Sequence, residues 1–336
     1  MTTEAEVLEV AGREVRVSNP DKVLFPKPGF TKMDVVRYFL DVGEATVHAA
    51  RHRPVTMRRF PDGIHGEAFY QKRVPKQRPE WLQTVTIRFP SGRSAEELVM
   101  ADVAHLIWMA NLASLELHRW PVRRTDVDHP DELLVDLDPT PRIPFASVRK
   151  VAGVVREVLE EHGLQGYPKT TGKRGLHVLA RIEPRWPFTE VRRAALALAR
   201  EVERRISLAT TAWWKEERRG VFVDYNQNAR DRTIASAYSI RPVEDARVSF
   251  PIQWGEVDDV DPGGFRLDTA PSLLRERGDA MEGIDDRAGS LESLLELAER
   301  DEREGKADAP WPVHHPKMPG EPTRVSPSRA RKRPGP

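Results

Sequence analysis

The spacing of apolar residues along the chain predicts helices and strands in alternation. Helical spacing occurs over residues 31–50, 94–118, 145–162, 188–206 and, in a charged stretch, 288–304. Shorter apolar runs predict strands at 53–60, 84–89, 176–182 and 220–226, extended segments at 233–242 and 246–254, and a hairpin over 7–17. This order of elements predicts an α/β or α+β fold, in which mixed central sheets are flanked by helices.

Capping residues mark the ends of several expected helices. Thr31 is a predicted N-cap, and Ser94 with Glu97 has the spacing of a capping box. We therefore expect one long helix over 94–118. Gly163 is expected to end the helix before it, because glycine favours the conformation in which helices terminate.

The last residues of the chain have a composition that cannot bury a core. Residues 310–336 hold eight prolines and six Lys or Arg residues against a single acid. We expect residues 306–336 to be disordered or draped over the surface. Residues 1–305 are expected to form one domain, made of an N-terminal part (1–125) and a catalytic core (126–265).

Composition limits the classes of function. The 336 residues are 39% hydrophobic and 31% charged, which indicates a soluble globular protein, and the formal net charge of +1 gives no global sign of nucleic-acid binding. The absence of cysteine excludes disulfides, thiolate zinc sites and a cysteine nucleophile, and it fits a cytoplasmic protein. We find neither a signal peptide nor an apolar run of about 18 residues, so we expect no membrane association.

Two aspartates close the apolar run DELLVDLDPTP. Side chains alternate along a strand, so Asp136 and Asp138 would share one face, while Val135 and Leu137 would share the other. Like charges this close repel unless a cation lies between them. Asp224 ends the run GVFVD in the same way. Three carboxylates at strand ends suit two divalent ions that clamp a phosphoryl group, and Mg²⁺ and Mn²⁺ prefer such oxygen ligands.

The residues alone leave more than one role open for the two aspartates. The pair could cap a turn or bind an arginine such as Arg123 or Arg124, and glycosyltransferases and acid phosphatase-like folds share the pattern. The segment TTGKRGLH favours phosphate binding, because its glycines let backbone N–H groups approach an anion, and Lys173, Arg174 and His177 add positive charge. It matches neither a Walker A loop nor a dinucleotide-binding fingerprint, and the basic tip of a hairpin would have the same composition.

A local concentration of charge predicts a nucleic-acid surface. Residues 51–78 carry eight cations against two acids, with Phe60, Phe69 and Tyr70 interleaved. The cations are Arg51, Arg53, Arg58, Arg59, Lys72, Arg73, Lys76 and Arg78. Positive charge for a phosphate backbone and rings for base stacking are the two components of a single-strand binding groove.

Four motifs in this order resemble the polymerase module of bacterial ligase D, a member of the archaeo-eukaryotic primase superfamily. They are DELLVDLDP, TTGKRGLHV, VDYNQN and TIASAYSIRP, and the opening SNPDKVLFPKPGFTKMDVVRYF is similar as well. The resemblance covers about residues 10–265 and leaves the tail outside. It implies an archaeo-eukaryotic primase-like catalytic core.

The resemblance implies a role for each matching residue. The implied metal ligands are Asp136, Asp138 and Asp224. The implied nucleotide-binding residues are His118, Thr171, Arg174, His177, Gln227 and Arg241. The implied DNA-binding residues are Asn19, Lys22 and Lys32 at a 5′-phosphate, Phe69 and Tyr70 at the template, and Arg58 in the basic surface. The family usually has Ser and Lys where Thr171 and Arg174 stand, and both changes keep the hydroxyl and the charge.

The resemblance also implies an activity. We expect a template-directed nucleotidyltransferase that adds ribonucleotides, and also deoxyribonucleotides, to primer 3′ ends at short gaps or breaks in bacterial end joining or excision repair. Its implied cofactor is Mn²⁺ or Mg²⁺ in a two-metal site, and its implied partners are gapped or broken DNA with a downstream 5′-phosphate, NTP or dNTP, a separate ATP-dependent ligase and Ku. The sequence has no Lys-x-Asp-Gly ligase motif and no nuclease-like histidine cluster, so we expect a free-standing, monomeric polymerase module. The alternatives are a primase that starts chains de novo and a DNA-end-binding scaffold whose metal site is vestigial.

Overall fold

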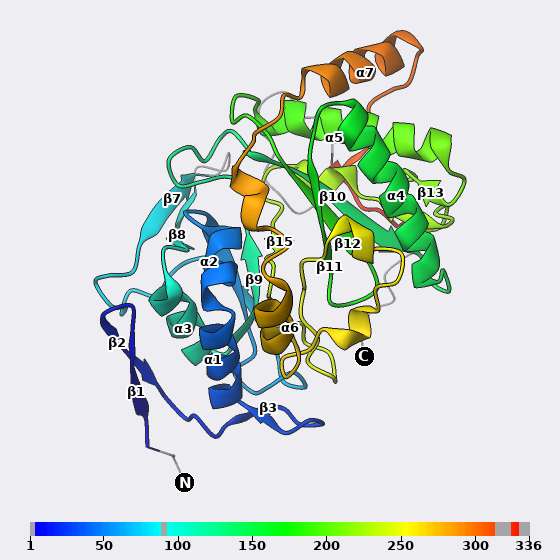
Figure 1. The fold of residues 1–336 in the computed structure, drawn as a ribbon. Coiled ribbons are helices and arrows are strands. Elements are labelled where there is room, and N and C mark those ends of the chain that lie inside the picture. Colours follow the sequence, from blue (N-terminus) through cyan, green and yellow to red (C-terminus); the bar gives the residue numbers. More distant parts are fainter. Residues whose placement is uncertain (1–3, 89–92, 313–323, 329–336) are drawn as a thin grey trace.

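Two β-sheets with helices packed on them form the protein in the computed structural model, which describes residues 4–88, 93–312 and 324–328 (Figure 1). The N-terminal sheet has the strand order β15-β9-β5-β8-β7, with β6 added on β5. Its strands are β5 (Pro54–Arg59), β6 (Phe69–Gln71), β7 (Thr84–Arg88), β8 (Ser94–Val99), β9 (Ser114–Arg119) and β15 (Ile234–Ala235). Helices α1 (Lys32–Asp41), α2 (Gly43–Ala50) and α3 (Val103–Asn111) lie in this part of the fold.

The second sheet has the order β11-β12-β10-β14-β13 and is mixed, because β13 and β14 run parallel while the other pairs are antiparallel. Its strands are β10 (Glu132–Pro139), β11 (Gly166–Thr170), β12 (Leu176–Arg181), β13 (Ala209–Thr210) and β14 (Val221–Val223). Helices α4 (Phe145–Glu161) and α5 (Phe188–Arg205) pack on it. The expected mixed α/β architecture is confirmed, and one hydrophobic core continues through both sheets.

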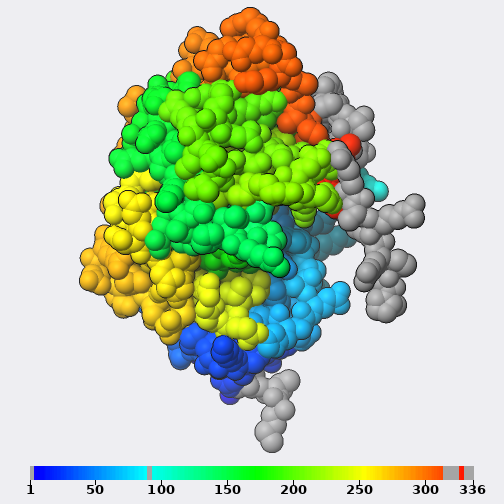
Figure 2. Space-filling view, turned by 90° about the vertical axis from the view of Figure 1, so that its right-hand side faces the viewer, coloured from blue at the N-terminus to red at the C-terminus, as the bar shows by residue number. Residues whose placement is uncertain are grey.

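Smaller elements complete the fold. The predicted hairpin at the start consists of β1 (Glu6–Val10) and β2 (Arg13–Val17), and β3 (Val23–Phe25) with β4 (Phe30–Thr31) forms a second hairpin. Helices α6 (Ala270–Arg277) and α7 (Glu292–Arg303) follow the sheets, and Figure 2 shows the orange α7 above the green second half of the chain. The described helices include none with both the length and the apolar character needed to cross a membrane.

The predicted long helix over 94–118 is wrong. Residues Ser94–Val99 form β8, whose alternating burial matches a strand, because this segment pairs with β7 and β5. The side chain of Asp102 then caps α3, and Ala113, with φ of +54°, ends that helix before β9. The segment over 31–50 also divides into two helices, although Thr31 caps the first as predicted.

Part of the expected disordered or draped tail packs on the fold. Residues 306–312 lie beside α5, and Trp311 is buried in a short pairing of β16 (Trp311–Pro312) with β17 (Arg324–Val325). Trp311 is buried because its indole ring is large and apolar. The charge and proline content of the tail do not indicate this packing. The remaining tail residues, 313–323 and 329–336, lie outside the described part of the chain.

A buried network of ion pairs joins the two sheets. Arg53, just before β5, lies 2.6 Å from Asp131 and 3.4 Å from Glu132 of β10, and Arg181 on β12 lies 3.1 Å from each of these acids. Arg119 on β9 also pairs with Glu132. Arg53 therefore does not belong to the basic surface expected over 51–78, because it is 1% exposed and paired within the core. The network fixes the orientation of one sheet against the other.

The contact between β10 and the loop before β12 provides a test of this fold. A Cβ atom on Gly175 would lie 2.3 Å from the backbone oxygen of Leu137, so Gly175→Ala must displace a strand or the loop. We expect this variant to lower the free energy of unfolding by about 1–3 kcal/mol. Gly153→Ala in α4 is the matched control, because its Cβ would meet nothing within 4 Å and alanine favours a helix. Urea denaturation of both variants measures the difference, and equal stability of the two would contradict the packing described.

Candidate active site

Three aspartates gather at one end of the second sheet. Asp136 and Asp138 lie on one face of β10, while Val135 and Leu137 on the other face are buried in the core. The antiparallel register of β10 and β14 continues past their last pair and places Asp224 beside Asp136, whose carbonyl accepts the N–H of Asp224 at 2.9 Å. The strands thus hold the three side chains next to one another. Neither Arg123 nor Arg124 pairs with them in the described structure.

The pKa values of all three aspartates are raised, by burial and, for Asp138 and Asp224, also by the charge of Asp136. The negative charge of Asp136, followed by burial, raises the pKa of Asp138 to about 7. Burial raises the pKa of Asp136 to about 6, although Lys169 and Arg241 act in the opposite direction. Burial and then the charge of Asp136 raise the pKa of Asp224 to about 6. A bound divalent cation would relieve this repulsion.

The donors at this end of the sheet fit a hard divalent cation. Oδ1 of Asp136 is buried and accepts no hydrogen bond from the described residues, which leaves it available as a ligand. Carboxylate oxygens are the ligands that Mg²⁺ and Mn²⁺ prefer. Within the described ranges, no three His, Asp or Glu side chains already converge on one point as a metal site does.

A buried chain of polar contacts leads away from Asp136. His177 lies opposite Asp136 across the β10–β12 pair, with Nε2 3.3 Å from Oδ1 of Asp136. Nζ of Lys169 lies 2.7 Å from Nδ1 of His177 and donates to Oγ of Ser249 at 2.6 Å. Burial, followed by the charge of Lys169, holds the pKa of His177 well below its usual value. The other ring nitrogen, Nε2, faces Asp136.

The glycine-rich segment packs its backbone on Arg241. A Cβ atom on Gly172, whose φ is +68°, would lie 2.5 Å from Cγ of Arg241, so only glycine fits there. Oγ1 of Thr171 accepts hydrogen bonds from the backbone N–H groups of residues 173 and 175. Thr171 and Arg241 thus lie close together. Arg174 instead is exposed and donates to two backbone carbonyls of the loop before α4.

Arg241 connects the aspartates to a second charged cluster on the N-terminal sheet. Its Nη2 lies 3.1 Å from Oε1 of Glu116 on β9, and Nη1 of Arg58 lies 2.5 Å from Oε2. Burial alone would raise the pKa of Glu116, but His118, Arg241 and Arg58 together lower it to about 2. His118 lies on a strand rather than at a helix end, and its ring meets Tyr70 edge-on at 5.4 Å. Nε and Nη1 of Arg241 are buried and donate to none of the described residues, so they suit an anion.

The structure adds residues that the sequence pattern did not predict. Glu116 could have been found from the alternation in SLELH, which places it on the same face of β9 as His118. Lys169 and Ser249 are far apart in the chain and meet only in the fold. Gln227, predicted for the nucleotide pocket, lies in the turn η1 (Tyr225–Asn228) just after Asp224, where it is buried and bonds a backbone carbonyl.

The three residues predicted at a 5′-phosphate lie together at the start of α1. The β3–β4 hairpin lets the N–H of Lys32 donate to the carbonyl of Lys22 at 2.8 Å, and Asn19 turns the chain with φ of +49°. Burial, followed by the charges of Lys22 and Arg59, lowers the pKa of Lys32. Lys22 pairs with the exposed Asp62 at 2.8 Å. Arg59, which the motifs did not assign to this site, therefore belongs to the same group of cations.

Two aromatic side chains are exposed on the edge strand β6. Phe69 is 43% and Tyr70 is 58% exposed. Arg59 and Arg58 lie opposite them on β5, each with its guanidinium carbon 5.3 Å from the ring centre. Phe60, by contrast, belongs to the core. An exposed ring with an arginine over its face suits a stacked base.

Comparison with known proteins places this arrangement in a family. Residues 31–281 match the model of the LigD primase-polymerase domain. The chain is 32% identical over 288 residues to the multifunctional non-homologous end joining protein LigD of Mycolicibacterium smegmatis, which covers 83% of this chain and 37% of that protein. It is 29% identical over 269 residues to the bifunctional non-homologous end joining protein LigD of Bacillus subtilis, which covers 79% of this chain and 43% of that one. The chain thus spans less than half of the length of these relatives.

A solved structure agrees with this assignment. It is described as the polymerase domain from Mycobacterium tuberculosis ligase D in complex with DNA, and it superposes with a TM-score of 0.74 at 31% identity. The match covers 82% of this chain and 99% of that domain. The resemblance that the motifs carry is therefore confirmed.

The repulsion among the aspartates predicts a dependence of stability on pH and metal. Because the folded pKa of Asp138 lies above its unfolded value, the metal-free protein loses stability as pH rises from about 4 to about 7. Asp138→Asn removes this charge, so we expect it to raise Tm by about 2 °C at pH 8 and by less at pH 5, a small effect because the side chain is exposed.

Differential scanning fluorimetry at both pH values, with and without Mn²⁺, measures how Tm depends on pH and on metal. Mn²⁺ should raise the Tm of the wild type more than that of Asp138→Asn. Asp41→Asn, at an exposed aspartate that ends α1, is the control and should show neither difference. A rise in the Tm of Asp138→Asn that is equal at pH 5 and at pH 8 would show that the aspartates do not repel one another as described.

Proposed function

Because the chain belongs to the LigD primase-polymerase domain family, we propose that it is a template-directed nucleotidyltransferase that extends a primer 3′ end across short gaps or breaks in DNA. The observation that carries this proposal is the juxtaposition of opposite charges at the seam of the two sheets. Three aspartates that repel one another face buried cations, and Arg241 has donors without partners among the described residues. Carboxylates suit metal ions, and free guanidinium donors suit a triphosphate.

Each side chain then has a task in binding or orientation. Asp136, Asp138 and Asp224 would hold two divalent ions, which when bound lower the pKa of the primer hydroxyl and neutralise the leaving pyrophosphate. Arg241, the hydroxyl of Thr171 and the loop at Arg174 bind the triphosphate, and Glu116 keeps the guanidinium of Arg241 in place through the contact at 3.1 Å. His177, which Lys169 contacts at 2.7 Å, places its Nε2 3.3 Å from Oδ1 of Asp136 and so helps to position that carboxylate.

The DNA-binding part of the proposal rests on the cations and rings of the N-terminal half. Phe69 and Tyr70 stack on template bases, and Arg58 joins them. Asn19, Lys22 and Lys32 form a pocket for the 5′-phosphate on the far side of a gap. The relatives are named for non-homologous end joining, so we assign this chain to the same repair, with a separate ATP-dependent ligase and Ku as partners.

The first test concerns the carboxylates. Asp136→Ala should reduce nucleotide addition at least about 100-fold on a gapped duplex, because it removes one of the three carboxylates that would hold the ions. Binding of the same duplex, measured by fluorescence anisotropy, should be unchanged. Asp41→Ala is the control and should keep full activity. Near-normal extension by Asp136→Ala at saturating Mn²⁺ would exclude the proposed metal role.

The second test concerns the sugar. We expect faster addition of a ribonucleotide than of the matching deoxyribonucleotide in a one-nucleotide gap, because the buried amide of Gln227 and the ring of His118 line the proposed pocket beside Asp224 and Tyr70. Single-turnover rates with Mn²⁺ and with Mg²⁺ measure this preference. A clear preference for the deoxyribonucleotide with both metals would contradict it.

The third test concerns the 5′-phosphate. A terminal phosphate carries more negative charge than an internal diester, so a cluster of cations favours it. A charge-assisted contact contributes about 1.5–3 kcal/mol, so the wild type should bind a gap with a downstream 5′-phosphate roughly tenfold more tightly than the same gap with a hydroxyl. Lys22→Ala should abolish this difference but leave extension of a simple primer-template largely intact.

The control for the third test is Lys27→Ala, which removes an exposed lysine of the same hairpin. It should weaken the binding of both gapped duplexes by the same factor. Titrations are made at one salt concentration, since every backbone contact depends on salt. Equal binding of both gaps by the wild type would mean that Lys22 and Lys32 do not form a phosphate pocket.

A further inference from the structure

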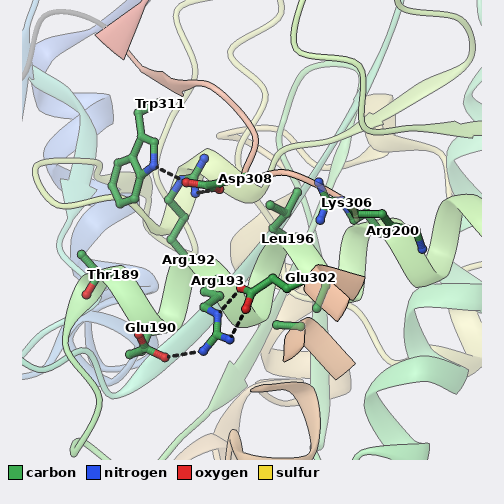
Figure 3. A pocket seen from close by; sticks show the side chains of 12 residues that line it. Thr189, Glu190, Arg192, Arg193, Leu196, Arg200, Glu302, Lys306, Asp308 and Trp311 are labelled. Atoms are coloured by element: carbon green, nitrogen blue, oxygen red, sulfur yellow. Dashed lines mark hydrogen bonds and ion pairs between the residues drawn. The ribbon is translucent and has the colours of Figure 1, made fainter. Parts of the chain in front are cut away.

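A cavity of about 220 Å³ lies between α5, α7 and the segment that follows α7. We call residues 306–312 the C-terminal strap. Three arginines of α5 line this cavity, and Figure 3 shows two of them, Arg192 and Arg193, pointing in different directions. Arg193 turns to Glu190 and Glu302, with which it forms ion pairs, whereas Arg192 turns to Asp308 and Trp311 of the strap.

Arg192 holds the strap with several contacts at once. Its Nη1 lies 2.8 Å from Oδ1 of Asp308, and its Nη2 donates to the carbonyl of Ala309 at 2.7 Å. The ring of Trp311 lies 4.0 Å from its guanidinium carbon, and Nε1 of that ring donates to Asp308 at 2.9 Å. Arg192 is 1% exposed, so this guanidinium is a fixed part of the core rather than a surface charge.

The same guanidinium also reaches the proposed active site. Nε of Arg192 donates to Oδ1 of Asn226 at 2.7 Å, and Nδ2 of Asn226 donates to the carbonyl of Pro310 in the strap at 3.0 Å. The backbone N–H of Asn226 then donates to Oδ1 of Asp224 at 2.9 Å. Arg192 and the strap therefore both bind the side chain of Asn226, whose backbone N–H donates to the carboxylate of Asp224.

We propose that Arg192 is a positioning residue for Asp224, and that the C-terminal strap acts with it to fix the turn η1 on which Asp224 is oriented. The proposal deepens the proposed function and rests on it, since Asp224 must act in nucleotide addition for its orientation to matter. The effect of Arg192 on Asp224 passes through Asn226. A loss of this support should lower the rate of the chemical step rather than the affinity for nucleotide.

The experiment compares three substitutions in the full chain on a gapped duplex. Arg192→Ala should lower kcat about tenfold with little change in KM for the nucleotide, and Asp308→Ala should lower it by a smaller factor in the same way. Arg193→Ala is the matched control, because this neighbour lies on the same helix and in the same cavity but bonds only Glu190 and Glu302 in the described structure. It should leave kcat and KM unchanged.

A second measurement is independent of activity. The rise in Tm on adding Mn²⁺ should be smaller for Arg192→Ala and Asp308→Ala than for the wild type and Arg193→Ala. If Arg192→Ala does not fold, Asp308→Ala decides, because half of the Asp308 side chain is exposed and its loss leaves the core intact. Wild-type values of kcat and of the Mn²⁺ response in Asp308→Ala and Arg192→Ala would overturn the proposal, as would an equal loss in Arg193→Ala. An inactive wild type would instead overturn the proposed function, while the Mn²⁺ response would still test the positioning.

Discussion

Repulsion among Asp136, Asp138 and Asp224 is the constraint on which the rest of the structure depends. A flexible loop would relax by moving such residues apart, but the backbone of β10 is hydrogen-bonded on both sides and keeps them close together. The register of the sheet therefore holds charges together that would separate in water. Strain of this kind persists only where the surrounding structure enforces it.

The fold offsets this negative charge with cations from both sheets. Lys169 and Arg241 act on Asp136 through short distances in a buried environment, where electrostatic interactions are strong. Burial in turn holds the pKa of Lys169 well below its usual value. The pKa of this lysine also depends on the charges beside it. Glu116, from the other sheet, keeps Arg241 in reach of the aspartates. The aspartates lie on the second sheet and Glu116 lies on the N-terminal sheet, and Arg241 interacts with both, so the site depends on how the two sheets meet.

The sequence predicted those features that depend on neighbours along the chain. Alternation in β10 gave the shared face of Asp136 and Asp138, and the helix start at Thr31 followed from its capping chemistry. The segment 94–118 was misjudged because apolar runs of this length fit either a strand or a helix, and only pairing with β7 decides. Lys169 and Ser249 escaped prediction because their contact joins residues 80 apart, and no local pattern encodes it.

The buried ion pairs between the sheets also restrict how this protein can evolve. Removing one member of a buried pair leaves an uncompensated charge and destabilises a protein by about 3–5 kcal/mol, whereas replacing both members by apolar residues can be neutral. Arg53 and Asp131 lie 78 positions apart and meet at 2.6 Å, and Arg181 shares the same acid. A lineage that alters this junction one residue at a time therefore passes through an unstable intermediate. We expect these arginines and acids to be kept together or replaced together.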